Sequence, residues 1–155
     1  MYNYFCWLKR FLVLVLWEDI EMDLELFLNK GNIEEEIVEY GATKKFTDEN
    51  GEPVKWQIRR MGINEYEKIR KSCTKMTSKT VIFDNELFMR KLIAESVKYP
   101  NMNNAELQDS YGVKKAEDLV PLMFANVGEY YDMQKFINEL NGFKSAEMEI
   151  EEAKN

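Results

Sequence analysis

Carboxylates are the only plentiful side chains in this sequence that could perform acid–base or metal chemistry. The chain has 28 acidic residues, 21 lysines and arginines, two cysteines and no histidine. Without histidine it has no histidine-based general acid–base catalysis, no histidine-containing triad and no ordinary catalytic zinc site. Cys6 and Cys73 cannot form a CxxC pair, and neither GxGxxG nor GxxxxGK[ST] occurs. A large share of enzyme mechanisms is therefore excluded.

The acidic residues are not spaced like a functional site. Glu34, Glu35 and Glu36 are adjacent, so their side chains point in different directions, whereas a calcium loop alternates its ligands around a glycine. Glu106 and Asp109 are one helical turn apart but have no base nearby in the sequence, and they fit the charge favoured at a helix N-terminus. We therefore expect a protein that is not an enzyme and has no metal and no cofactor.

The charge balance argues against nucleic acid as a partner. A net charge of −7 repels phosphate backbones and removes the electrostatic attraction on which non-specific binding depends. Basic residues do cluster between residues 55 and 71, but Glu65 and Glu67 are interspersed among them. This mixture favours a solvated face over a binding patch. The cluster consists of Lys55, Arg59, Arg60, Lys68, Arg70 and Lys71.

The first structured region is predicted to be a β-hairpin. Val54, Trp56 and Ile58 alternate with polar residues, which is the period of a strand with one buried face. Residues 37–46 supply the partner strand. The sequence between them contains Asn-Gly followed by Pro53, which suits a tight turn.

After Met61 the hydrophobic period changes to that of helices. Residues 74–80 are expected to form a polar loop, Val97 ends the apolar stripe of the second helix, and Pro121 kinks a helix over 116–124. The fold class is therefore α+β: an N-terminal β-hairpin followed by a bundle of about five short to medium helices. The predicted helix caps are Asn64 with Glu67, Asp84, Asn104, and Asn126 with Glu129.

The ends of the chain differ from its middle. Residues 1–21 are an apolar N-terminal extension, and the simplest interpretation is that Met22 is the natural start. The apolar run from Phe11 to Trp17 is too short to span a bilayer, and no cleavage site of a signal peptide follows it. An interfacial membrane anchor is the alternative. We expect a single domain over 22–143 and a flexible acidic tail over 144–155.

Several aromatic residues occur at near-helical spacing in the last third of the chain, where most are expected to fill the core. Tyr130 and Tyr131 are adjacent, so both cannot face inward on a helix, and an exposed tyrosine is a good anchor for a protein partner. The candidate partner-binding residues are Leu107, Tyr111, Leu119, Tyr130 and Tyr131.

Several residue strings in the second half of the chain form one pattern: NAELQDSYGV (104–113), AEDLV (116–120), GEY (128–130) and INELNGF (137–143), with GEPVKW (51–56) and IRKSCT (69–74) earlier in the chain. Through these strings the sequence over about 22–143 resembles the XkdN-like family of phage tail assembly chaperones. The extension before Met22 and the proline at position 121 depart from the family pattern.

The resemblance implies a phage tail assembly chaperone in the cytoplasm of the bacterial host, absent from the mature particle. It would serve a long-tailed phage, a prophage or a phage-tail-like bacteriocin, usually of the contractile type. The expected partner is the tape measure protein, a long and aggregation-prone helical chain, with the tail tube protein as a second candidate. The expected binding mode places apolar helix faces of the partner in grooves of the chaperone.

Three other functions stay open at this stage. The protein could be a structural tail or baseplate accessory that remains in the particle, which mass spectrometry of particles would detect. It could be an enzyme that uses only carboxylates, which a deep acidic cleft or a bound divalent ion would indicate. It could also be a small regulatory or inhibitor domain with a host target.

Overall fold

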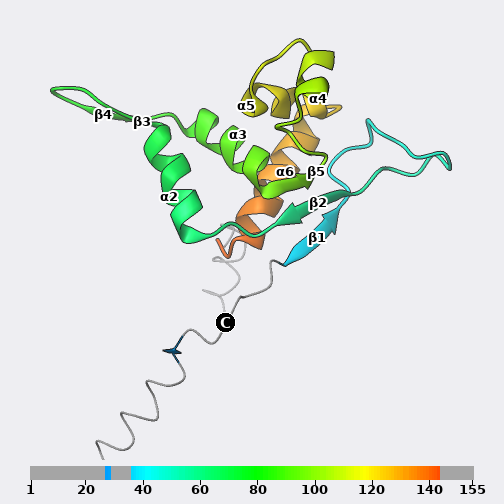
Figure 1. Cartoon of the computed structure of the whole chain (residues 1–155), viewed down its shortest axis with the longest axis horizontal. Coiled ribbons are helices and arrows are strands. Elements are labelled where there is room, and N and C mark those ends of the chain that lie inside the picture. Colours follow the sequence, from blue (N-terminus) through cyan, green and yellow to red (C-terminus); the bar gives the residue numbers. More distant parts are fainter. Residues whose placement is uncertain (1–26, 29–35, 144–155) are drawn as a thin grey trace, which may run out of the picture. The chain divides into compact units, whose positions relative to one another are not determined.

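The computed structural model describes residues 27–28 and 36–143 (Figure 1). The chain divides into two units between residues 34 and 35, and the elements described below belong to the second unit. The predicted extension over 1–21 and the predicted tail over 144–155 lie outside the described residues.

The predicted N-terminal hairpin is confirmed. Strand β1 (Ile37–Tyr40) pairs antiparallel with β2 (Trp56–Arg59), in a register that sets Ile37 opposite Arg59 and Tyr40 opposite Trp56. The connecting turn is held by Asp48, whose carboxylate accepts hydrogen bonds from the backbone N–H groups of residues 50 and 52 at 2.8 and 2.9 Å. Gly51 has a φ of 80°, which a glycine adopts without steric cost.

A third strand, β5 (Val97–Tyr99), completes the sheet in the order β1-β2-β5. The hydrophobic spacing predicted that Val97 belongs to the apolar stripe of a helix, and this prediction was wrong. Helix α3 (Asn85–Ser96) ends just before it, and Val97 is the first residue of the strand. Val97 is buried in either case, which is why hydrophobic spacing alone could not separate the two assignments.

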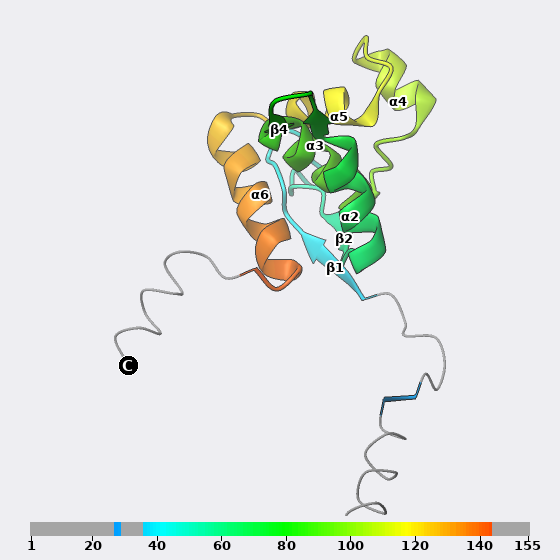
Figure 2. The ribbon, with the colours of Figure 1, turned by 90° about the vertical axis from the view of Figure 1, so that its left-hand side faces the viewer.

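The helices follow the strands as predicted, and the α+β fold class is confirmed. Figure 2 shows α2 and α3 beside each other, with α6 across the same face of the sheet, where Tyr40 of β1 stacks on Phe136 at 3.9 Å between ring centroids. The predicted kink at Pro121 is a change of helix type after Leu119. Besides α3, the helices are α2 (Ile63–Ser72), α4 (Ala105–Ser110), α5 (Ala116–Leu119), the 3₁₀-helix η1 (Val120–Met123) and α6 (Val127–Leu140).

Three predicted helix caps form, and the fourth was placed wrongly. Asp84, Asn104 and Asn126 each accept a backbone hydrogen bond from the third residue after them, at 2.9 to 3.0 Å. Helix α2, however, begins after Gly62, whose N–H donates to the Glu65 carboxylate at 3.2 Å. Asn64 is already inside this helix. The helix begins earlier than predicted because Glu65, which accepts the hydrogen bond from Gly62, is also bound by Arg59.

The segment predicted to be a polar loop contains a second β-hairpin. Strand β3 (Thr74–Met76) pairs with β4 (Val81–Phe83), and Thr77 and Thr80 close the turn with a backbone hydrogen bond of 2.8 Å. In Figure 1 this hairpin extends away from the helices. The serine and threonine content that suggested a loop belongs to the turn itself.

The core lies between the sheet and the helices. Trp56 and Ile58 point into it from β2, and Cys73 is buried as expected. Arg59 departs from the predicted alternation, since it too is mostly buried. The fully buried side chains from the helices and the segments between them include Leu92, Ile93, Met102, Leu119, Val120, Met133 and Ile137. Within the described ranges, no helix is both long enough and apolar enough to cross a membrane.

Candidate partner-binding surface

The described carboxylates are engaged in structural contacts or spread over the surface. Over residues 27–28 and 36–143, no group of three or more aspartate, glutamate or cysteine side chains is placed to hold a metal ion. Glu36 is the described member of the acidic run, and its carboxylate lies 3.3 Å from Nε of Arg60. These acidic side chains are arranged to form ion pairs at the protein surface.

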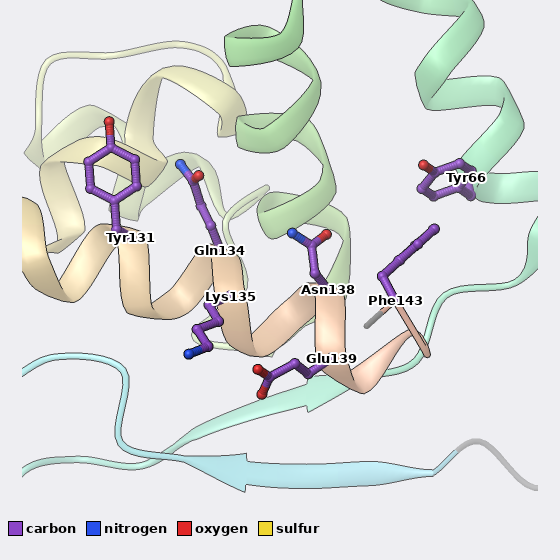
Figure 3. A pocket seen from close by; sticks show the side chains of 7 residues that line it. All are labelled: Tyr66, Tyr131, Gln134, Lys135, Asn138, Glu139 and Phe143. Carbon is purple, nitrogen blue, oxygen red and sulfur yellow. The ribbon is translucent and has the colours of Figure 1, made fainter. Parts of the chain in front are cut away.

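A groove of about 430 Å³ runs along the outer face of α6 (Figure 3). Its floor and sides come from residues spaced three and four apart on α6, which therefore share one face of the helix. Figure 3 shows Tyr131 at one end of the groove and Phe143 with Tyr66 of α2 at the other. The α6 residues between them are Gln134, Lys135, Asn138 and Glu139.

The end of α6 places Phe143 at the groove. Gly142 has a φ of 86°, and the N–H groups of Gly142 and Phe143 donate to the carbonyls of Glu139 and Asn138 at 2.9 and 3.0 Å. This is the double hydrogen bond of a Schellman motif, which turns the chain back over the last turn of the helix. The Phe143 ring consequently lies 5.7 Å from that of Tyr66, which also makes an edge contact with Phe88 at 5.3 Å.

The start of α6 is fixed by Glu129. Its carboxylate accepts hydrogen bonds from the Thr43 hydroxyl at 2.6 Å and from the backbone N–H groups of Ala125 and Lys44 at 3.0 and 3.2 Å. The bond from Thr43 is the main cause that holds the pKa of Glu129 below its usual value. The predicted capping box is therefore half correct: Asn126 caps Glu129, but the Glu129 side chain is bonded to Thr43, Lys44 and Ala125.

The two adjacent tyrosines of α6 differ in exposure. Tyr130 is half-buried and packs edge-on against Phe124 at 5.5 Å. Tyr131 is 62% exposed and lines the groove. One tyrosine therefore faces the core side and the other faces out, as the sequence predicted.

Of the five residues named from the sequence, the structure brings only Tyr131 to the groove. Leu107 and Tyr111 are half-buried on or beside α4, where the Tyr111 ring lies 5.1 Å from the ammonium of Lys45. Leu119 is 0% exposed, so it belongs to the core. Tyr66 and Phe143 were missed as groove residues, although an aromatic residue directly after a C-terminal helix glycine was a usable signal for Phe143.

A second hollow of about 480 Å³ lies between α2, α3 and the start of α5. Its charged lining includes Lys68 and Lys91 together with Glu65, Glu95 and Glu117. Both signs of charge are present around it, so it has no field that would select a ligand of one sign.

Comparison with known proteins gives consistent results. The model of a family described as phage XkdN-like tail assembly chaperone proteins matches residues 24–154. The uncharacterised protein YqbN of Bacillus subtilis (strain 168) is 26% identical over 136 residues, which cover 84% of this chain and 91% of YqbN. The phage-like element PBSX protein XkdN of the same strain is 24% identical over 139 residues, covering 86% of this chain and 94% of XkdN.

A solved structure shares the fold. The crystal structure of the protein YqbN superposes with a TM-score of 0.65 at 22% identity, and the match covers 76% of this chain and 94% of that one. The likeness supports the arrangement of strands and helices described above.

Proposed function

The chain belongs to the XkdN-like family of phage tail assembly chaperones, and from this membership we propose that it binds the tape measure protein without catalysing a reaction. It would assist tail tube assembly in a long-tailed phage, a prophage or a phage-tail-like bacteriocin, and it would be absent from the finished particle. The contractile type of tail and the host cytoplasm are the proposed setting, and the tail tube protein is a second proposed partner.

The groove along α6 is the observation that carries this proposal. It has an exposed aromatic side chain at each end, Tyr131 and Phe143, and about 15 Å of helix between them. A partner helix of nearly three turns fits that length and can place one apolar residue at each aromatic end. Tyrosine is among the side chains that most often supply binding energy at an interface, and phenylalanine is enriched at interfaces.

The middle of the groove would add specificity. Gln134 and Asn138 offer amide groups, and Lys135 and Glu139 offer charges of opposite sign, all along one face of α6. These groups can hydrogen-bond to polar side chains along the edges of a bound helix. Recognition by apolar anchors with polar edges is how amphipathic helices are held in grooves.

The test is co-expression with the tape measure protein encoded in the same tail gene cluster, followed by pull-down. We expect a complex with the native chain and at least a tenfold loss of affinity in Tyr131→Ser/Phe143→Ser, since each buried anchor contributes about 1–2 kcal/mol or more. Tyr99→Ser is the matched control, because Tyr99 is exposed on β5 and does not line the groove.

The possible outcomes test the proposed partner and the proposed binding site separately. No complex with the native chain at micromolar concentration would argue against the tape measure protein as partner. Equal binding by the native chain and the double variant would show that the partner binds outside the groove. Mass spectrometry of purified particles tests the remaining part, since a retained protein would be a structural accessory.

A further inference from the structure

The β3–β4 hairpin is an exposed apolar surface outside the α6 groove. The register sets Met76 opposite Val81, and Phe83 lies on the same face because it is two residues after Val81. These three side chains are 82%, 65% and 42% exposed, and Ile82 on the other face is 54% exposed. Apolar side chains that are exposed together mark interaction sites, whereas singly scattered ones do not.

The hairpin also belongs to a segment of unusual charge. Residues 68–83 contain five basic residues and no acidic one, in a chain whose net charge is −7. Within the part of the chain that the structure describes, only Lys71 of these five is ion-paired, to Glu67 at 3.9 Å. The other four basic side chains are available to an acidic partner. The five are Lys68, Arg70, Lys71, Lys75 and Lys79.

Both strands of the hairpin are edge strands. They form a sheet of two strands, and neither pairs with any other strand among residues 36–143. Figure 1 shows the hairpin extending away from the helices. The outer edge of such a strand presents backbone N–H and C=O groups with which a further strand can pair.

We propose that the outer edge of β3 binds an acidic, amphipathic segment of a partner protein by strand addition. The bound segment would set an acidic side chain beside Lys75 and apolar side chains beside Thr74 and Met76, since neighbouring positions of β3 lie on opposite faces. This site is separate from the groove, so it does not depend on the tape measure protein as partner.

The lysines make the edge selective. A lysine on a sheet edge opposes pairing with neutral or basic strands, and this protects many proteins from aggregation. It favours a strand that places a carboxylate opposite it. Lys75 on β3 and Lys79 in the turn are both exposed, so both can contact such a strand. The edge therefore selects an acidic segment and rejects others.

A third strand would also stabilise the outer half of the hairpin. Two short strands are marginal on their own, whereas three strands with an apolar face are more stable. The base is already held, because the Asp84 N–H donates to the Cys73 carbonyl at 3.0 Å and Phe83 lies 5.3 Å from Phe88. The added strand would cover the outer part, which carries Met76.

A synthetic peptide of nine alternating valines and glutamates is the probe. We expect the full-length chain to bind it, with changes in amide NMR signals centred on residues 74–83. A peptide of alternating valines and lysines should not bind. A peptide of the same composition as the probe, with its glutamates in one block, should bind at least about tenfold more weakly, because it cannot place charge and apolar side chains on opposite faces.

Reversing the charge of the edge gives the sharpest test. Lys75→Glu/Lys79→Glu should lower the affinity for the glutamate peptide about tenfold and create binding of the lysine peptide, which unfolding would not do. Lys114→Glu/Lys115→Glu is the charge-matched control, since both lysines are exposed before α5 and outside the hairpin. Tyr131→Ser/Phe143→Ser should bind the peptide as the native chain does, which distinguishes this site from the groove.

Four results would overturn the proposal. Unchanged signals in 74–83 would exclude the hairpin as the site. Equal affinity for the alternating and block peptides, or an equal loss in the control variant, would reduce the effect to net charge. Loss of peptide binding in the groove variant would place the peptide on α6. Sedimentation of the native chain with phosphatidylserine vesicles, lost in Lys75→Glu/Lys79→Glu and without peptide binding, would make an anionic membrane surface the occupant.

Discussion

The hydroxyl of Thr43 donates a 2.6 Å hydrogen bond to the carboxylate of Glu129, which lies 86 positions later in the chain. The same carboxylate accepts from the backbone N–H groups of Lys44 and Ala125. One side chain thus ties the segment after β1 to the start of α6, and its negative charge is favoured at that end of the helix. The contact fixes the first turn of the groove helix, while Met133 and Ile137 hold the rest of α6 against the core.

Glu129→Gln should lower the free energy of unfolding by about 1 kcal/mol, because a neutral amide cannot accept all three hydrogen bonds as strongly as a carboxylate. Urea unfolding at neutral pH measures the change. Glu49→Gln is the control, since Glu49 is exposed in the hairpin turn. Equal unfolding midpoints for the two variants would show that the Thr43–Glu129 contact has no energetic weight.

The contact between Arg59 and Glu65 predicts a pH dependence. The guanidinium donates to both carboxylate oxygens at 2.8 and 3.0 Å, and this is the main cause that lowers the pKa of Glu65 from 4.5, with a further hydrogen bond from Gly62. A carboxyl group whose pKa is lower in the folded state adds stability above its unfolded pKa. That stability is lost as the pH falls through 4.5 toward the folded pKa.

Glu65→Gln should therefore destabilise the protein at neutral pH and make much less difference in acid, below the folded pKa. Unfolding curves of both proteins across this range give the comparison. Glu67→Gln serves as the control, since its ion pair with Lys71 is on the surface at 3.9 Å and such pairs contribute less than about 1 kcal/mol. A constant difference between wild type and Glu65→Gln at all pH values would contradict the assigned role.

Features determined by neighbouring residues could be predicted from the sequence. The caps at Asp84, Asn104 and Asn126 each join residues three apart, and the first hairpin follows from its alternation and its Asn-Gly turn. The exposure of at least one of Tyr130 and Tyr131 followed from helix geometry alone, because neighbours on a helix point about 100° apart.

Features determined by contacts between distant residues could not be predicted from the sequence. Nothing near Glu129 in the sequence indicates Thr43 as its partner, and the capping box at Asn64 failed because Arg59 holds Glu65 in the earlier turn. Strand β5 forms only because β2 offers it a pairing edge, so Val97 has no local signal that separates strand from helix. The groove joins Tyr66 to Phe143, 77 positions apart, and its aromatic end could not be assembled from spacing.

Leu119 and Leu122 lie three residues apart and should respond very differently to truncation. Leu119 is 0% exposed, so Leu119→Ala should cost about 2–5 kcal/mol through lost burial and a cavity. Leu122 is 40% exposed, and Leu122→Ala should cost less than about 1 kcal/mol. Thermal or urea unfolding distinguishes them. Similar small effects would mean that Leu119 is accessible and could contact a partner directly.

Tyr130 and Tyr131 provide the sharpest separation of folding from binding. Tyr130→Ala should destabilise the chain by about 2 kcal/mol or more, because its ring packs on Phe124 beside the core. Tyr131→Ala should leave the free energy of unfolding within about 0.5 kcal/mol of wild type, since its ring is mostly exposed. If Tyr131 is an anchor, the second variant should nevertheless lose most of its affinity for the tape measure protein. Stability loss in Tyr131→Ala, or full binding by it, would contradict the division of roles between these two neighbours.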